Sequence, residues 1–170
     1  MLTDTGLIGL LLIAVIFDLK ERRIPNLLIL IGMVMAVIYQ VYTGGYTGLL
    51  FSLQGLAIGI ALLLIPFIMG GIGAGDVKLL GMIGAFKGST FVVSTFLWMA
   101  LWGGLIAVIL LIIEGRLGET LKRLGRGLVL SGLGIAKLSD SVNKEEFSIY
   151  YPYGVAIALG VLSSYCRGWW

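Results

Sequence analysis

The sequence predicts an all-α, polytopic membrane protein, and three observations carry this prediction. Of the 170 residues, 59% are hydrophobic and only 12% are charged, whereas a soluble domain carries about a quarter charged residues. The apolar residues stand in continuous blocks and do not alternate with polar ones, which disfavours a β-barrel. The polar sequence is too short for a separate soluble domain, so we expect one membrane-embedded domain over residues 1–170.

Six apolar blocks predict about six transmembrane helices. A crossing needs about 20 residues, so the first and fourth blocks are short and could continue through their polar flanks. Residues 1–6 contain Asp4 but no Lys or Arg, unlike the basic start of a cleavable signal peptide, so we expect the first block to be retained. The blocks cover residues 6–17, 27–42, 49–69, 77–86, 91–113 and 149–165.

Turn signals separate several of the blocks. Pro25 disfavours a helical residue before it, and Asn26 is predicted to cap the second helix. Residues 43–48 are rich in glycine and predict an external loop, and Pro66 is expected to kink or end the third helix. Residues 70–75 contain four glycines and predict a flexible connection to the fourth helix.

The cations predict the orientation in the membrane, because Lys and Arg gather in cytoplasmic loops near helix ends. With the N-terminus outside and six crossings, ten of the twelve cations fall on the cytoplasmic side, and only Lys87 and Arg167 fall outside. Residues 114–148 place four leucines on one helical stripe with basic residues opposite, which predicts an amphipathic helix on the inner leaflet. This segment could dock substrate or bind anionic lipid, but a simple positive-inside linker is the favoured interpretation.

Histidine is absent and Cys166 is the single cysteine, which excludes several kinds of chemistry. The chain cannot build an HExxH zinc site, a Ser-His dyad or a structural disulfide. We therefore expect no metal and no other cofactor, and catalysis would depend on carboxylates.

Two of the nine carboxylates are distinctive. Asp18 lies at the inner end of the first block and Asp76 at the inner start of the fourth, so both are expected at the cytoplasmic membrane face. Two carboxyl groups close together share one proton, and such a pair can hydrolyse a peptide bond by activating water with one member and protonating the carbonyl with the other. The structural alternatives are an N-cap for Asp76 and a surface ion pair with Arg22 for Asp18.

The residues around both aspartates strengthen the catalytic interpretation. Gly73 and Gly75 flank Ala74 before Asp76, which lets backbone approach closely and leaves space for an extended substrate. Lys20 and Lys78 each follow an aspartate by two positions, and we favour a role for them as positive-inside anchors that reach the lipid headgroups. Helix ends favour Asp76 as the ionised base and Asp18 as the protonated acid.

These stretches resemble the prepilin peptidase family of GxGD membrane aspartic proteases, and its short pilin-assembly members most. The resemblance implies that Asp18 and Asp76 are the catalytic pair, with Lys20, Pro25, Asn26, Gly73, Gly75 and Lys78 in the supporting motifs. The stretches are residues 18–26 (DLKERRIPN), 73–79 (GAGDVKL) and 151–158 (YPYGVAIA).

The resemblance also implies the substrate and the compartment. The substrate would be a type IV pilin-like precursor, cut after its basic leader at the cytoplasmic face of a prokaryotic inner membrane, with lipid as the other partner and no nucleic acid. Val155 stands where family members often have proline, and residues 18–25 leave no room for the cysteine-containing loop of bifunctional members. Peptidase activity without methyl transfer is therefore expected.

Two other functions fit the same composition. A small proton-coupled transporter would also contain intramembrane aspartates, but near mid-bilayer. A non-catalytic scaffold subunit would use the aspartates only as caps or ion-pair partners.

Overall fold

A computed structural model describes residues 2–21, 23–113, 115 and 153–168. The predicted amphipathic segment, apart from Gly115, lies outside the described residues, as do Arg22, Tyr151 and Pro152. The chain divides into two compact units, one formed by Met1–Gly103 with Pro152–Trp170 and the other by Gly104–Tyr151. Of the second unit, the described part is the last turns of one helix and the turn residue Gly115.

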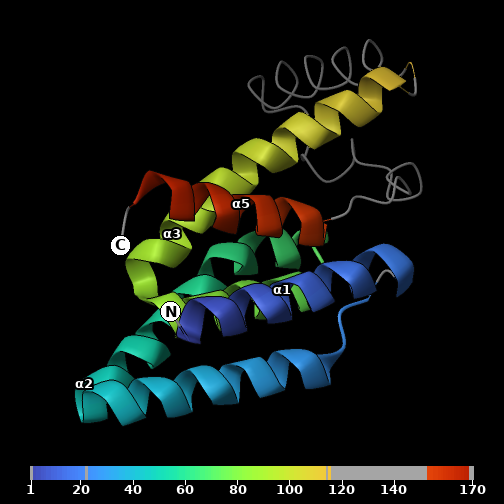
Figure 1. The fold of residues 1–170 in the computed structure, drawn as a ribbon. Helices are drawn as coiled ribbons and strands as arrows, with labels where there is room; N and C mark the ends of the chain where they lie inside the picture. The colour runs from blue at the N-terminus through green and yellow to red at the C-terminus, as the bar shows by residue number, and fades with distance from the viewer. Residues whose placement is uncertain (1, 22, 114, 116–152, 169–170) are drawn as a thin grey trace. The chain divides into compact units, whose positions relative to one another are not determined.

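The described residues form four helices and no strand, which confirms the predicted all-α class (Figure 1). Within the first unit, α1 packs against α2 and α5. The core of this unit takes fully buried side chains from all four helices, including Leu7, Ile29, Leu63, Phe91 and Ile157. The helices are α1 (Leu2–Glu21), α2 (Asn26–Ile68), α3 (Ala74–Ile113) and α5 (Tyr153–Arg167).

Helix α2 joins the second and third predicted blocks into one element that bends sharply near its middle (Figure 1). The prediction of a loop over residues 43–48 is wrong, because all but Gly45 keep helical backbone angles. Gly45 has φ 57° and ψ −133°, a conformation that glycine adopts without steric cost. The backbone of Gly48 meets that of Gln40, and residues eight apart in a straight helix would be about 12 Å apart. The chain therefore doubles back at Gly45.

Helix α3 joins the fourth and fifth predicted blocks in the same way. Gly88 interrupts it with φ 81° and ψ −178°, and a Cβ at this position would collide with the ring of Phe51. Both the backbone angle and the close ring therefore require glycine. The predicted count of six crossings remains a prediction, since the described residues form four helices of which two contain such a break.

The first turn of α2 differs from its prediction. The N-cap residue is Pro25, with no side-chain cap, and its carbonyl accepts hydrogen bonds from the amides of Leu28 and Ile29 at 3.1 and 3.4 Å. The prediction that Asn26 caps this helix is therefore wrong. Pro66 lies in the last turn of α2, which ends two residues later at Ile68, as expected from its missing amide.

Glycines bring α2 and α3 into close contact. A Cβ on Gly55 would collide with the carbonyl of Gly84, and a Cβ on Gly84 would collide with that of Gly55. One turn further along α2, a Cβ on Gly59 would lie 2.6 Å from the carbonyl oxygen of Leu80 and 2.9 Å from the Cα of Gly81. Small residues at such spacings let helix backbones approach each other, which is how helices associate within lipid.

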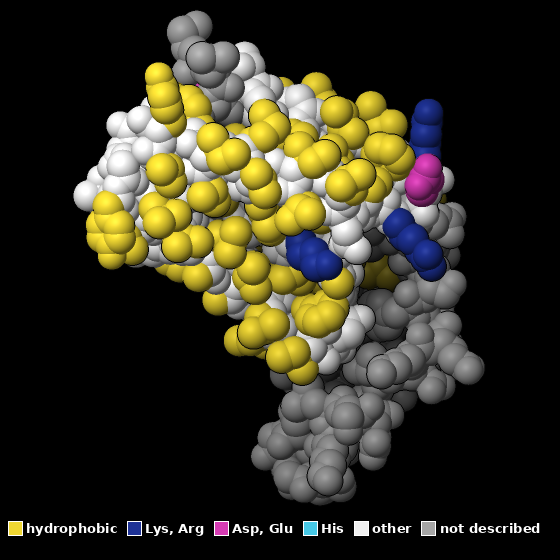
Figure 2. Space-filling model, turned by 90° about the horizontal axis from the view of Figure 1, so that it is seen from below, with side chains coloured by type: hydrophobic (Ala, Val, Ile, Leu, Met, Phe, Trp, Pro, Cys, Tyr) yellow, Lys and Arg dark blue, Asp and Glu magenta, His cyan; other side chains and the backbone are white. Residues whose placement is uncertain are grey.

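The outer surface of these helices is apolar. Both α2 and α3 are long and apolar enough to cross a membrane, and in their most apolar 18-residue stretches only 28% and 6% of the residues are buried. Figure 2 shows one face of the molecule, where hydrophobic side chains cover most of the described surface and few charges interrupt them. Soluble monomers rarely expose apolar patches of this extent, so this surface is suited to contact with lipid.

The contact at Gly59 leads to a test of helix packing. We expect Gly59→Ala to lower stability by about 1–3 kcal/mol, because the added methyl group meets backbone that cannot rotate away. The measurement is thermal unfolding of the purified protein in detergent. Gly9→Ala on α1 is the control, since nothing lies within 4 Å of a Cβ there. Equal unfolding temperatures for the two variants would contradict the close approach of α2 and α3.

Candidate active site

Asp18 ends a buried stripe on α1. Leu11 and Ala14 precede it by seven and four positions on the same helix face, and the Asp18 side chain is only 7% exposed. The amide of Gly154, in the first turn of α5, donates a 2.9 Å hydrogen bond to its Oδ2. The first amides of a helix lack partners within that helix, so α5 provides Asp18 with a donor. Its burial excludes the alternative of a surface charge.

Asp76 lies in the first turn of α3, and its side chain is 8% exposed. The helix begins two residues earlier, so Asp76 is not its N-cap. A Cβ on Gly73 would lie 3.1 Å from Oδ2 of Asp76, and Gly73 itself is exposed. Glycine therefore leaves one exposed approach to this carboxyl group open. Oδ1 of Asp76 is buried and has no hydrogen-bond partner.

The two carboxyl groups lie close enough for the charge of Asp18 to act on Asp76. The hydroxyl of Tyr153, the first residue of α5, interacts electrostatically with Asp76 in turn. Three helices thus meet at this place, with α1 supplying Asp18, α3 supplying Asp76, and α5 supplying Tyr153 and the Gly154 amide.

The other motif residues join α3 to the connection between α1 and α2. A Cβ on Gly75 would lie 3.4 Å from the Cβ of Ile24, and Nζ of Lys78 donates a 2.9 Å hydrogen bond to Oδ1 of Asn26. Pro25, which lies between Ile24 and Asn26 in the sequence, is the N-cap residue of α2. These contacts hold the start of α3, and therefore Asp76, beside the end of α1.

Lys20 does not take part in these contacts. It is exposed on α1, two positions beyond the buried Asp18, and therefore on a different side of the helix. Lys78 is also exposed, but it donates a hydrogen bond to Asn26. The prediction of a headgroup anchor did not include this contact.

Tyr153 and Gly154 are the site residues that sequence reasoning did not select, although they fall in the third stretch of the resemblance. A Cβ on Gly154 would lie 2.6 Å from Oδ2 of Asp18, so only glycine fits here. The signal in the sequence was a glycine directly after Tyr-Pro-Tyr, at the start of an apolar block. Nothing in that pattern indicates which carboxylate it faces.

This arrangement suits hydrolysis by a pair of carboxyl groups. When two carboxyl groups share one site, they can retain one proton between them, because a second negative charge is repelled. One member can then accept a proton from water while the other donates a proton to a carbonyl oxygen. A peptide backbone could approach along the exposed turn that precedes Asp76.

Comparison with known proteins places the chain in a family. No curated protein and no solved structure matches the chain. The sequence profile of the type IV leader peptidase family matches residues 6–108. This stretch contains Asp18, Asp76 and both motifs around them, and it ends before α5. It is more than half of the chain, and the protein therefore belongs to the type IV leader peptidase family.

Proposed function

We propose that this protein is a membrane aspartic endopeptidase that removes the leader peptide of type IV pilin-like precursors, with Asp18 and Asp76 as its catalytic pair. Membership of the family supports a peptidase that processes prepilin-like substrates. The observation that carries the rest is the meeting of two buried carboxyl groups from α1 and α3. Both fall within the stretch that matches the family.

The reaction needs one ionised and one protonated carboxyl group. The ionised group takes a proton from water as the water oxygen attacks the carbonyl carbon, and the protonated group gives its proton to the carbonyl oxygen. When the resulting diol collapses, the C–N bond breaks, the leaving nitrogen takes the proton that the first group received from water, and a diol hydroxyl returns a proton to the second group. The products are a carboxylic acid on the leader and an amine on the mature chain, and the pair returns to its starting state.

The hydrogen bonds favour a different assignment of roles from the one expected from helix ends. The Gly154 amide donates to Asp18, and an N–H donor stabilises a carboxylate more than a carboxylic acid. Oδ1 of Asp76 is buried without a partner, and a proton on this group lowers the cost of burying it. We therefore assign Asp18 as the base and Asp76 as the acid.

The proposal includes the topology, with one peptidase domain over residues 1–170 that crosses the membrane six times. Helix α2 would be about 65 Å long if straight, and the hydrocarbon core is about 30 Å thick. The break at Gly45 divides α2 into segments of 19 and 23 residues, each about the length of one crossing. Lys20 and Arg23 lie next to the Asp18 end of α1, and by the positive-inside tendency they support a site on the cytoplasmic side.

The catalytic pair is tested by cleavage of a purified pilin-like precursor in detergent. We expect Asp18→Asn and Asp76→Asn each to lower kcat/KM by about 10²-fold to 10⁴-fold, the usual contribution of a general acid or base. Because the two residues act as a unit, the double variant should lose little more than the worse single variant.

Glu21→Gln is the matched control, since Glu21 is an exposed carboxylate at the same end of α1. Its kcat/KM should stay within about twofold of the wild type, as for a surface charge away from the reaction. Cleavage that persists in both aspartate variants would contradict the proposal and support a scaffold role.

The Gly154 contact gives a separate prediction. We expect Gly154→Ala to lower kcat by about 10²-fold, because a Cβ 2.6 Å from Oδ2 of Asp18 must displace that carboxyl group. Gly59→Ala is the control, because its methyl group also meets a close backbone, but that of Leu80 and Gly81 and not the carboxyl group of Asp18. Both variants are assayed below their unfolding temperatures. If Gly154→Ala retained the same fraction of the wild-type kcat as Gly59→Ala, Gly154 would not position Asp18.

A further inference from the structure

Two carboxylates of helix α1, Asp4 and Asp18, lie at the two ends of a buried apolar stripe. Asp4, Leu7, Leu11, Ala14 and Asp18 follow one another at intervals of three, four, three and four residues, the spacing of a single stripe along a helix. The three apolar members are buried, with Leu7 and Ala14 fully inaccessible. We call this stripe the α1 seam. The first predicted block begins at residue 6, after Asp4, but Asp4 lies within α1 at the end of the seam opposite Asp18.

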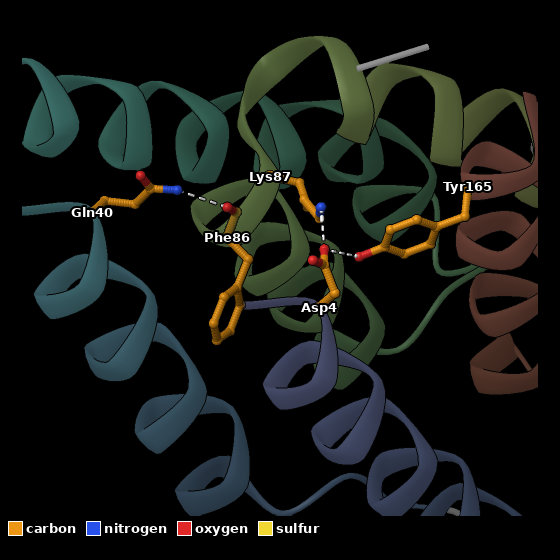
Figure 3. Close-up of polar contacts among 5 residues, drawn as sticks. All are labelled: Asp4, Gln40, Phe86, Lys87 and Tyr165. Atoms are coloured by element: carbon orange, nitrogen blue, oxygen red, sulfur yellow. Dashed lines mark hydrogen bonds and ion pairs between the residues drawn. The ribbon is translucent and has the colours of Figure 1, made fainter. Parts of the chain in front are cut away.

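A polar cluster surrounds Asp4 (Figure 3). Nζ of Lys87 forms an ion pair with Oδ1 of Asp4, and the hydroxyl of Tyr165 donates a 2.8 Å hydrogen bond to the same oxygen. Lys87 also lies over the rings of Phe91 and Tyr165, 5.6 and 4.8 Å from their centroids. The Lys87 side chain is 12% exposed and that of Asp4 is 29% exposed, so this pair is shielded well beyond an ordinary surface ion pair.

The position of Lys87 is itself held by the break in α3. Lys87 directly precedes Gly88, where the helical angles are interrupted, and Nε2 of Gln40 on α2 donates a 2.8 Å hydrogen bond to the carbonyl of Phe86 (Figure 3). A break in a helix leaves carbonyl groups without their usual amide partners, and Gln40 satisfies this one. The bend that presents Lys87 to Asp4 is therefore secured from α2.

The same three helices meet at both ends of the α1 seam. Asp18, Asp76 and Gly154 meet at one end, and Asp4, Lys87 and Tyr165 meet at the other, with one member of each set on α1, α3 and α5. On α1 the two members are 14 positions apart, about 21 Å along the axis. On α3 and α5 they are 11 positions apart, about 17 Å.

An apolar seam alone specifies register weakly. Leu7, Leu11 and Ala14 make contacts without direction, and lipid offers no hydrophobic penalty against a shifted packing. Polar groups at defined seam positions do specify register, because any shift leaves a buried charge without its partner. A shift of α1 by one turn, about 5.4 Å, would carry Asp18 away from both Asp76 and Gly154.

We propose that Asp4, Lys87 and Tyr165 form a register lock that positions Asp18 against Asp76 and Gly154. These three are positioning residues, because they act through the packing of α1 and do not touch the reacting atoms. The catalytic consequence depends on the proposed function, but the effect on register does not, so the two can be tested separately.

Register is measured by disulfide formation between engineered cysteines, in a Cys166→Ser background that removes the native thiol. The reporter pair is Asp18→Cys with Gly154→Cys, since a Cβ at residue 154 lies 3.1 Å from the Cβ of Asp18. The control pair is Ile24→Cys with Gly75→Cys, at 3.4 Å, which includes no residue of α1. Both distances are near the 3.5–4.5 Å of disulfides, and small adjustments complete the bond.

We expect Lys87→Met, and separately Asp4→Asn, to slow the oxidation of the reporter pair by about threefold or more, because a disulfide forms only within a narrow range of geometry. In the same variants, the oxidation rate of the control pair should stay within about twofold of its rate without the substitution, since its geometry does not depend on α1. Unchanged oxidation of the reporter pair would overturn the proposal. A parallel loss in both pairs would also overturn it, because it would indicate general destabilisation.

Activity is measured with the native aspartates in place. Lys87→Met should lower kcat for precursor cleavage by about tenfold, because a shifted α1 misplaces Asp18. KM should change by less than about twofold, because the lock lies at the end of the helices remote from the reaction. The exchanged double variant Asp4→Lys with Lys87→Asp should recover much of the kcat that either single exchange loses.

Slower oxidation of the reporter pair with unchanged kcat would overturn the positioning role. If the wild-type protein fails to cleave any pilin-like precursor, the proposed function fails. The oxidation rates still decide whether the lock sets the register.

Discussion

The burial of two carboxyl groups within electrostatic reach of each other is the constraint on which the rest of this structure depends. Each group loses hydration within an apolar set of helices, and each repels the charge of the other. The Gly154 amide donates a hydrogen bond to Asp18, and a proton on one member of such a pair would remove most of the repulsion. The hydrogen bond from α5 to α1 requires a short distance between donor and acceptor. Helices α1, α3 and α5 must therefore hold their relative positions closely.

Glycine lets the helices hold these positions in two different ways. At Gly55, Gly59 and Gly84 the missing side chain lets α2 and α3 touch through their backbones, so that packing replaces the hydrophobic drive that lipid does not provide. At Gly45 and Gly88 the positive φ lets a helix break and change direction. The first use fixes helices against each other, and the second sets where each helix turns.

Much of the fold followed from local features of the sequence. Continuous apolar blocks predict helices because their period and composition are local properties, and the two aspartates stood out because charge within such blocks is costly. The breaks at Gly45 and Gly88 were harder to locate. Glycine-rich sequence indicates a turn, but whether the helix resumes at once depends on contacts such as that of Gln40 with Phe86, 46 residues away.

The roles of single polar residues were predicted least well, again because they depend on contacts with residues distant in the sequence. Asn26 has the residue type of an N-cap, yet its side chain accepts a hydrogen bond from Lys78, 52 positions later. Asp4 has the position of a tail residue, yet it pairs with Lys87 and Tyr165. Local propensity describes what a side chain can do, and the partners that decide what it does come from distant parts of the chain.

Helix α5 shows how the site depends on sequence beyond the stretch that defines the family. The match to type IV leader peptidases ends at residue 108, and α5 begins at Tyr153, after the residues of the second unit. Yet α5 belongs to the first unit, its Gly154 amide donates a hydrogen bond to Asp18, and Tyr153 lies within electrostatic reach of Asp76. Residues 6–108 contain both carboxyl groups but not the Gly154 amide that donates to Asp18. In the proposed assignment, which makes Asp18 the base, this contact from α5 favours the ionised form of Asp18.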